Sequence, residues 1–218
     1  MPDPLLQFLA SPAGALVLAA LGAGVPAMVA VALRERRRAR PLAEAFGGRI
    51  ALRGDVVLRH ADRRIRLARV PAGRGGGTVA IVETRARRAL WVGNLRAPAH
   101  RHVGPLRWPT AVADGPRGAL RVGAKDRRVL ARAIAAVAAH DPGPLFEAPD
   151  AAVRIAPHLV VTRRGLARRF RAVCFGLPPG VWQDPAGLRP YLDPLVGLVA
   201  AMEEVAGVRG APPGRAAE

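Results

Sequence analysis

A long uncharged segment constrains this chain more than any other feature of its sequence. From Leu5 to Leu33, 29 consecutive residues carry no formal charge, and most of them are Leu, Val, Ala or Gly. A helix that crosses the hydrocarbon core of a bilayer needs about 20 apolar residues, at roughly 1.5 Å per residue. The 21 residues from Ala13 to Leu33 reach that length even if the helix begins at Pro12. The sequence therefore predicts an N-terminal transmembrane helix within residues 1–33.

Arginines follow the uncharged segment at once and set the expected orientation. Five arginines lie in the juxtamembrane flank, residues 34–40, whereas Asp3 is the sole charged side chain before the segment. Because Lys and Arg are retained on the cytoplasmic side of a membrane, we expect the N-terminus outside and the rest of the chain in the cytoplasm. The alternative is an exported protein with a cleaved signal peptide, which would place its basic residues before a shorter apolar core.

The net charge of +18 comes from 34 Lys+Arg against 16 Asp+Glu, and it is concentrated next to the apolar segment. An anionic leaflet attracts each nearby basic residue by about 1 kcal/mol, so we expect the lipid bilayer to be a partner. A membrane-tethered nucleic-acid-binding protein is the alternative, although aromatic residues for base stacking make up 4% of the chain. The candidate membrane-surface residues are Arg34, Arg36, Arg37, Arg38, Arg40, Arg63, Arg64 and Arg66.

Residues 41–209 alternate between extended and helical patterns. A helical turn at 41–46 ends at two glycines, and short alternating runs up to residue 92 predict a meander of four or five strands. Helical spacing of apolar residues predicts one helix over 125–140 and another that begins at Asp184-Pro185 or at Asp193-Pro194. We therefore predict an α+β class for the cytoplasmic domain, an antiparallel sheet with two packing helices. Residues 210–218 are expected to be a disordered tail.

The residue types that act in catalysis or ligand binding do not occur in the spacing of any known catalytic, metal or phosphate-binding motif. Cys174 is the sole cysteine, which excludes an intrachain disulfide, and Ser11 is the sole serine, which excludes a serine hydrolase. The pair His100 and His102 has no acidic neighbour, and the glycine-rich run 73–77 lacks the spacing and the lysine of a phosphate-binding loop. We predict no catalytic, metal or cofactor-binding residues, no cofactor, and a protein that is not an enzyme.

The arrangement of these segments resembles a group of known proteins. A single N-terminal span, an arginine-rich flank, the run Leu-Ala-Glu-Ala-Phe-Gly-Gly at 42–48 and a strand-rich domain resemble uncharacterised bacterial single-span membrane-anchored proteins with a cytoplasmic α+β domain. The resemblance implies a location in the bacterial inner membrane and implies no activity. We therefore expect a single-pass inner-membrane protein whose arginine-rich domain contacts anionic lipid or a protein partner, a second copy of the chain included.

Overall fold

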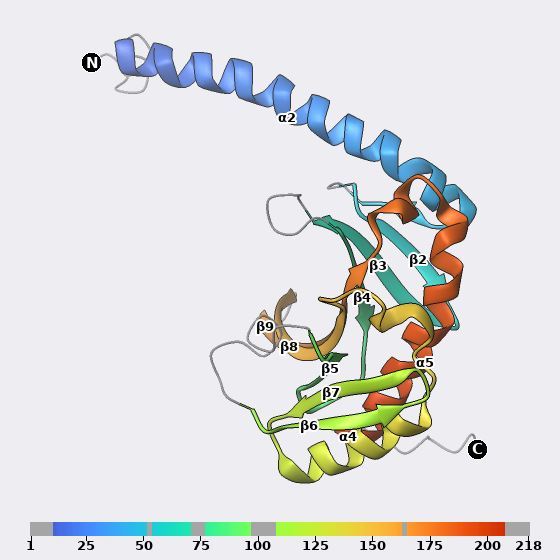
Figure 1. Ribbon diagram of the computed structural model, residues 1–218. Helices are drawn as coiled ribbons and strands as arrows, with labels where there is room; N and C mark the ends of the chain where they lie inside the picture. Colours follow the sequence, from blue (N-terminus) through green and yellow to red (C-terminus); the bar gives the residue numbers. More distant parts are fainter. Residues whose placement is uncertain (1–10, 52–53, 71–76, 97–107, 163–164, 208–218) are drawn as a thin grey trace, which may run out of the picture.

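The computed structural model describes residues 11–51, 54–70, 77–96, 108–162 and 165–207, with the backbone alone at 17–23, 25, 159–162 and 165–168. These residues form an α+β structure in which a long helix, α2 (Pro12–Ala45), leads into a large antiparallel sheet (Figure 1). The predicted tail at 210–218 lies outside the described residues. The predicted class and the antiparallel sheet are confirmed.

Helix α2 is continuous from Pro12 to Ala45, whereas the sequence predicted an apolar helix and a separate turn at 41–46. Ser11 caps its start, where the side-chain oxygen accepts a hydrogen bond from the Gly14 N–H at 3.1 Å. The residues between the two predicted helical segments are mostly Arg and Glu, which favour helix. Ion pairs of Arg38 with Glu35 and of Arg40 with Glu44 support the same turns. No helix in the described part of the chain is both long and apolar enough to cross a membrane.

Nine strands within the described ranges form one sheet, in the order β1-β2-β3-β4-β9-β8-β5-β7-β6, and every pair of neighbours is antiparallel. Their bounds are β1 Arg49–Ile50, β2 Val56–His60, β3 Arg63–Val70, β4 Gly77–Glu83, β5 Leu90–Asn94, β6 Thr110–Gly115, β7 Gly118–Ala124, β8 Ala152–Thr162 and β9 Gly165–Leu177.

The sheet departs from the predicted meander after β4. The β8–β9 hairpin lies between β4 and β5, so β4 pairs with β9 and β5 pairs with β8. Strand β6 was not predicted, because Asp114-Gly115 at its end resembles a turn. A two-residue turn joins β2 to β3: Ala61 and Asp62 both have positive φ, as a type I′ hairpin requires.

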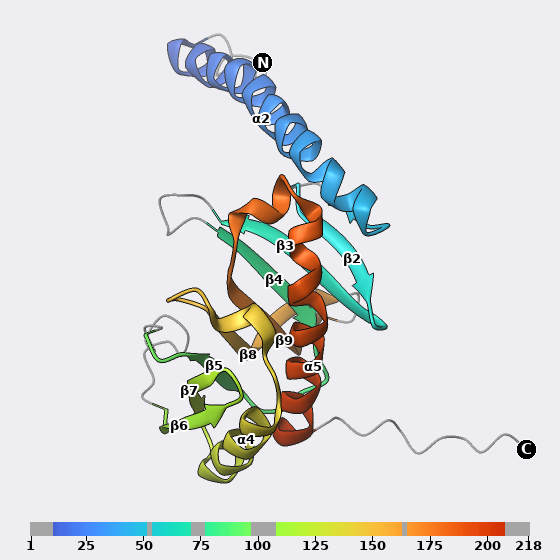
Figure 2. The ribbon, with the colours of Figure 1, turned by 45° about the vertical axis from the view of Figure 1, so that its right-hand side comes forward.

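Two helices pack on one face of the sheet, as predicted. They are α4 (Arg127–Ala139) and α5 (Arg189–Ala206), and Figure 2 shows α5 running across β4 and β9 while α4 lies below β6 and β7. Three 3-10 helices complete this layer: η2 (Gly143–Phe146), η3 (Pro179–Trp182) and η4 (Pro185–Leu188). Asp184 caps η4, and Pro194 lies inside α5, so the alternative start at Asp193-Pro194 is wrong.

The core between helices and sheet is aliphatic. Val56, Leu58, Ile65 and Leu67 alternate with less buried neighbours along β2 and β3 and are 2% exposed or less. On α5 the predicted apolar stripe is buried, namely Leu188 just before the helix, then Leu192, Leu195, Val199 and Met202. Each such side chain stabilises the folded state by about 1.5–3 kcal/mol relative to exposure.

Two of the described residues buried in this structure are polar, Thr78 and Glu203, and Glu203 is the charged one, at 5% exposed. Arg63 at the start of β3 donates to both carboxylate oxygens, at 2.9 and 2.7 Å. The Thr84 hydroxyl donates at 2.5 Å and the Arg85 backbone N–H at 2.7 Å. The carboxylate thus joins α5 to the start of β3 and to the segment after β4. Burial raises the pKa of Glu203, but these hydrogen bonds outweigh it and the pKa is lowered overall.

We predict that Glu203→Gln destabilises the protein by about 3 kcal/mol, because it leaves the Arg63 guanidinium half-buried without its counter-charge. The matched control is Glu204→Gln, one residue along the helix. The Glu204 side chain is exposed, so its loss should change the free energy of unfolding by less than about 0.5 kcal/mol. Urea denaturation of the two variants measures the difference, and equal effects would contradict the role given to Glu203.

The same carboxylate predicts a dependence of stability on pH. A carboxyl whose folded-state pKa is lowered contributes stability above its unfolded pKa of about 4.3, and this contribution is lost as the pH falls through the folded value. The free energy of unfolding should therefore drop more steeply with acidification in the wild type than in Glu203→Gln. Parallel slopes for both proteins below that pKa would contradict the prediction.

Candidate membrane-contact site

The last turns of α2 belong to the packed domain. Ala39 and Leu42 are fully buried and Ala43 is 5% exposed, and this face of the helix packs against β1, β2, η3 and η4. The arginines of the flank lie on the remaining surface of the same turns and are exposed. The orientation of these arginines relative to the sheet is therefore fixed by core packing.

A half-buried carboxylate adds a polar contact to this junction. Glu35 accepts hydrogen bonds from Arg38 at 3.2 Å and from Arg69 of β3 at 3.4 Å. Gly54, with φ +81°, lies so close that an added Cβ would be 2.8 Å from the Glu35 Cβ. Only glycine combines that backbone conformation with so close an approach of the helix.

The other partner of Glu35 is itself held in place. The Arg69 guanidinium lies over the Trp182 ring, 4.9 Å from the ring centre, which is a cation–π geometry. The indole N–H of Trp182 donates to the Thr78 hydroxyl at 2.8 Å, and that hydroxyl donates to the Pro178 carbonyl at 3.2 Å. This chain of contacts connects α2 through β3 to η3.

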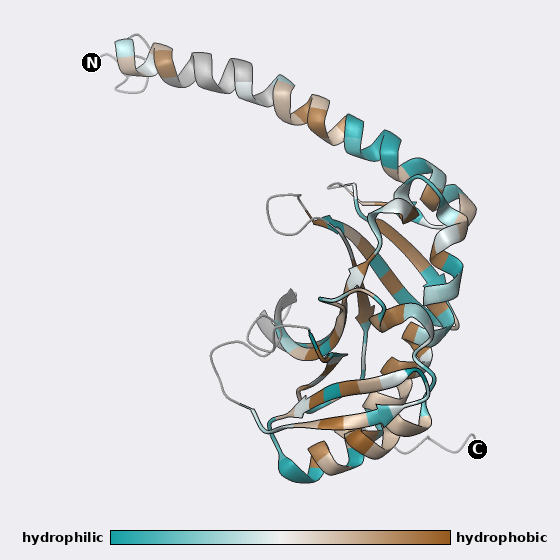
Figure 3. Cartoon of the chain, in the orientation of Figure 1, coloured by the Kyte–Doolittle hydropathy of each residue, from teal (hydrophilic) through white to brown (hydrophobic). Residues whose placement is uncertain are grey.

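The exposed surface of α2 changes abruptly from apolar to basic. Leu16, Met28 and Val31 are 72%, 67% and 62% exposed. Figure 3 shows the corresponding change in colour where the arginines begin. Along the described part of the chain, Arg34, Arg36 and Arg37 have no recorded ion pair, so their charges are free to meet an external anion.

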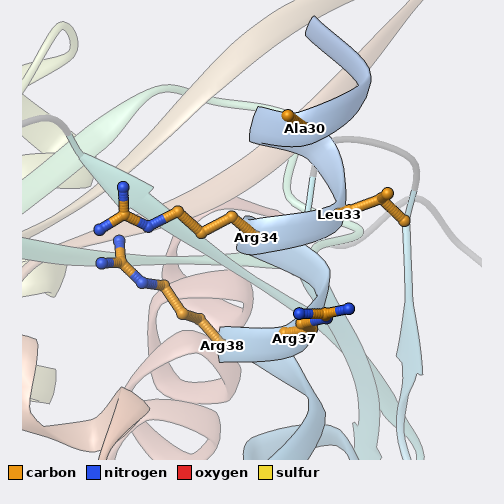
Figure 4. Close-up of a pocket in the computed structure, with 5 residues that line it drawn as sticks. All are labelled: Ala30, Leu33, Arg34, Arg37 and Arg38. Carbon is orange, nitrogen blue, oxygen red and sulfur yellow. The ribbon is translucent and has the colours of Figure 1, made fainter. Parts of the chain in front are cut away.

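Two shallow hollows lie along this basic region. The first, of about 480 Å³, is lined by Ala30, Leu33, Arg34, Arg37 and Arg38. In Figure 4, Arg34 and Arg38 extend in the same direction from the helix, while Leu33 points to the other side. The second hollow, of about 580 Å³, includes Arg36 and Arg40. Such a surface offers guanidinium groups and aliphatic side chains together, the combination that a lipid headgroup region can contact.

The predicted arginines of β3 have internal partners instead. Arg63 binds Glu203 and its side chain is 22% exposed. Arg66 binds Asp55, and Arg64 lies 3.7 Å from the Glu83 carboxylate. On α2, Arg38 and Arg40 pair with glutamates of the same helix, whereas Arg34, Arg36 and Arg37 have no ion pair among the described residues. The predicted arginines of β3 are paired with residues of the domain, where Arg63 in particular stabilises the fold.

No local pattern predicted the contact of Glu35 with Arg69, because 34 residues separate the two. Metal or cofactor ligands were not predicted, and His100, His102 and residues 73–76 of the glycine-rich run lie outside the described residues. Among the residues that the structure describes, no three His, Cys, Asp or Glu side chains gather closely enough to hold a metal ion.

We predict that Glu35→Ala weakens the junction between α2 and the sheet. The pair with Arg69 is about one-third exposed, so its loss should cost roughly 1 kcal/mol. Amide hydrogen exchange at 39–45 should become faster, because the buried turns open more often. Glu44→Ala is the matched control, since Glu44 is 63% exposed and binds the exposed Arg40. Equal exchange in both variants would contradict the prediction.

Comparison of the chain with protein-family models, with curated proteins and with solved structures finds no match. The site is therefore interpreted from its own geometry and charge. These give a helix whose exposed surface is apolar before Arg34 and basic after it, fixed to an α+β domain through its final turns.

Proposed function

We propose that this chain is a single-span protein of the bacterial inner membrane, which holds its arginine-rich α+β domain against the anionic cytoplasmic leaflet. In this proposal the uncharged segment from Leu5 to Leu33 crosses the bilayer and the N-terminus lies outside. The domain is an interaction module that contacts anionic lipid or a protein partner.

The observation that carries the proposal is the junction at Leu33 and Arg34. Apolar side chains are strongly exposed on the turns before it, and exposed arginines follow it on the same helix. Exposed apolar side chains in such a row are costly in water and favourable in lipid. Basic residues at the end of such a segment interact with headgroup phosphates.

The rigid attachment of α2 supports a role for the domain surface as well. Because Leu42 and Ala39 are buried in the core, a bilayer that surrounds the first turns of α2 would have a fixed relation to the sheet. Three arginines without recorded partners, each worth about 1 kcal/mol beside an anionic surface, would add about 3 kcal/mol to membrane apposition.

The test uses the full chain in nanodiscs that contain either neutral lipid or anionic phosphatidylglycerol. We expect slower amide hydrogen exchange around residues 34–50 in the anionic discs, and we expect salt to abolish the difference because salt screens exposed charges. Replacement of Arg34, Arg36 and Arg37 by Gln should also abolish it.

The control replaces Lys125, Arg127 and Arg128 by Gln, which removes the same charge from an exposed region at the start of α4. This control should retain the difference between the two lipids. Equal exchange in both kinds of disc would contradict lipid contact by the flank. Protection of the same residues by DNA, with a steep dependence on salt, would favour the nucleic-acid alternative.

A further inference from the structure

Basic side chains also gather on the β8–β9 hairpin, on the face of the sheet opposite the helices. Ile155 on β8 and Ala172 on β9 are buried in the core, so their sequence neighbours point to the other face. That face carries Arg154 and His158 from β8 and Arg171 from β9. Arg154 lies opposite Val173, and Arg171 lies opposite Ala156, so the two arginines are diagonal neighbours.

Arg154 is only partly accessible, and its guanidinium lacks an internal acceptor. Its Nε atom is buried and has no hydrogen-bond partner. Burial lowers the pKa of Arg154, yet a guanidinium stays charged in a protein. A buried donor without an acceptor destabilises the folded state, and more so when the donor is charged. This arginine is thus poorly satisfied by the protein itself.

Arg171 adds a second positive charge beside Arg154, whereas His158 is shifted toward its neutral form. Burial lowers the pKa of His158, and the charges of Arg171 and Arg154 lower it further. The three groups are therefore close enough to interact. Across the hairpin on β4, Glu83 lies opposite Arg171, but its carboxylate is 60% exposed and its recorded ion pair is with Arg64. No ion pair of Arg154 or Arg171 is recorded in the described part of the chain.

Apart from Glu83 and His158, most of the described side chains beside the two arginines are small or apolar, and Trp91 on β5 lies opposite Arg154. Ala156 separates Arg154 from His158 on β8, and Ile81 on β4 and Val173 on β9 extend the same face. Such neighbours cannot accept hydrogen bonds with their side chains. Two guanidinium groups in this setting present several donors to one anion, and their planar geometry suits the oxygens of a phosphate group.

We propose that Arg154 and Arg171 form a binding site for a phosphate-type oxyanion, with His158 at its edge. The site lies on the sheet and is distinct from the arginines of α2, so it does not require the membrane-anchor proposal. The buried Nε of Arg154 is out of reach of the solvent, so the anion would contact the terminal Nη groups of the two arginines and neutralise two adjacent cations. A free phosphate and the phosphodiester of a lipid headgroup share this chemistry.

The test measures thermal unfolding of the full chain in a nonionic detergent, with ionic strength held constant by chloride. The probes are inorganic pyrophosphate and a soluble short-chain phosphatidylglycerol, both at low millimolar concentration. A ligand that binds the folded state raises the Tm according to its concentration and dissociation constant. We expect at least one probe to raise the Tm, and the identity of that probe separates free phosphate from a lipid phosphodiester.

The variants Arg154→Gln and Arg171→Gln should each weaken the binding at least about tenfold, as the loss of a charge-assisted hydrogen bond requires. Arg59→Gln is the matched control. Arg59 is exposed on β2, faces the same side of the sheet and has no recorded ion pair in the described residues. The Arg59→Gln variant should bind the probe with a dissociation constant within about twofold of the wild-type value, as expected for a surface substitution away from the site.

A second measurement keeps the test informative if a variant is poorly stable. Without a probe, Arg154→Met should unfold at the same temperature as wild type or higher, because it removes a cation with no internal partner. Two results would overturn the proposal. One is the absence of any Tm rise in wild type with both probes, and the other is an equal rise in Arg59→Gln, Arg154→Gln and Arg171→Gln.

Discussion

The ion pair between Arg63 and Glu203 is the contact on which the arrangement of helices and sheet most depends. It sits in an otherwise apolar layer and fixes α5 against one end of β3. At the other end of the same strand, Arg69 binds Glu35 and so holds α2. One strand thus supplies an arginine to each of the two long helices. The geometry of α2, and with it the position of the basic flank, follows from these contacts and from the burial of Leu42.

Local patterns in the sequence predicted the elements that depend on local physics. The spacing of apolar residues predicted α4 and α5, and the alternation in Arg64–Leu67 predicted β3 with one buried face. The insertion of the β8–β9 hairpin between β4 and β5 was not predictable in this way. Strands β4 and β9 pair across about 90 residues. Such pairing leaves no periodic pattern in either strand, because it depends on how the whole apolar face of the sheet is covered.

Local patterns in the sequence also do not show which arginines of the candidate site have internal partners. In the sequence, Arg63 and Arg66 are indistinguishable from Arg34 and Arg36, and all were expected at the membrane surface. The fold gives Arg63 a buried carboxylate 140 residues away and gives Arg66 the carboxylate of Asp55, while the arginines of α2 stay exposed. Partner residues distant in the sequence therefore decide which arginines stabilise the fold and which remain free for an external anion.

The membrane-span proposal is tested most directly by labelling introduced cysteines in intact bacterial cells. The native Cys174 is buried and its pKa is raised to about 12, so it should stay unreactive in the folded chain. With a membrane-impermeant thiol reagent added outside the cytoplasmic membrane, Asp3→Cys should be labelled and an exposed position of the domain, Arg127→Cys, should be labelled only after lysis. Labelling of Arg127→Cys before lysis would contradict the proposed orientation, and protection of both positions would contradict a span with an external N-terminus.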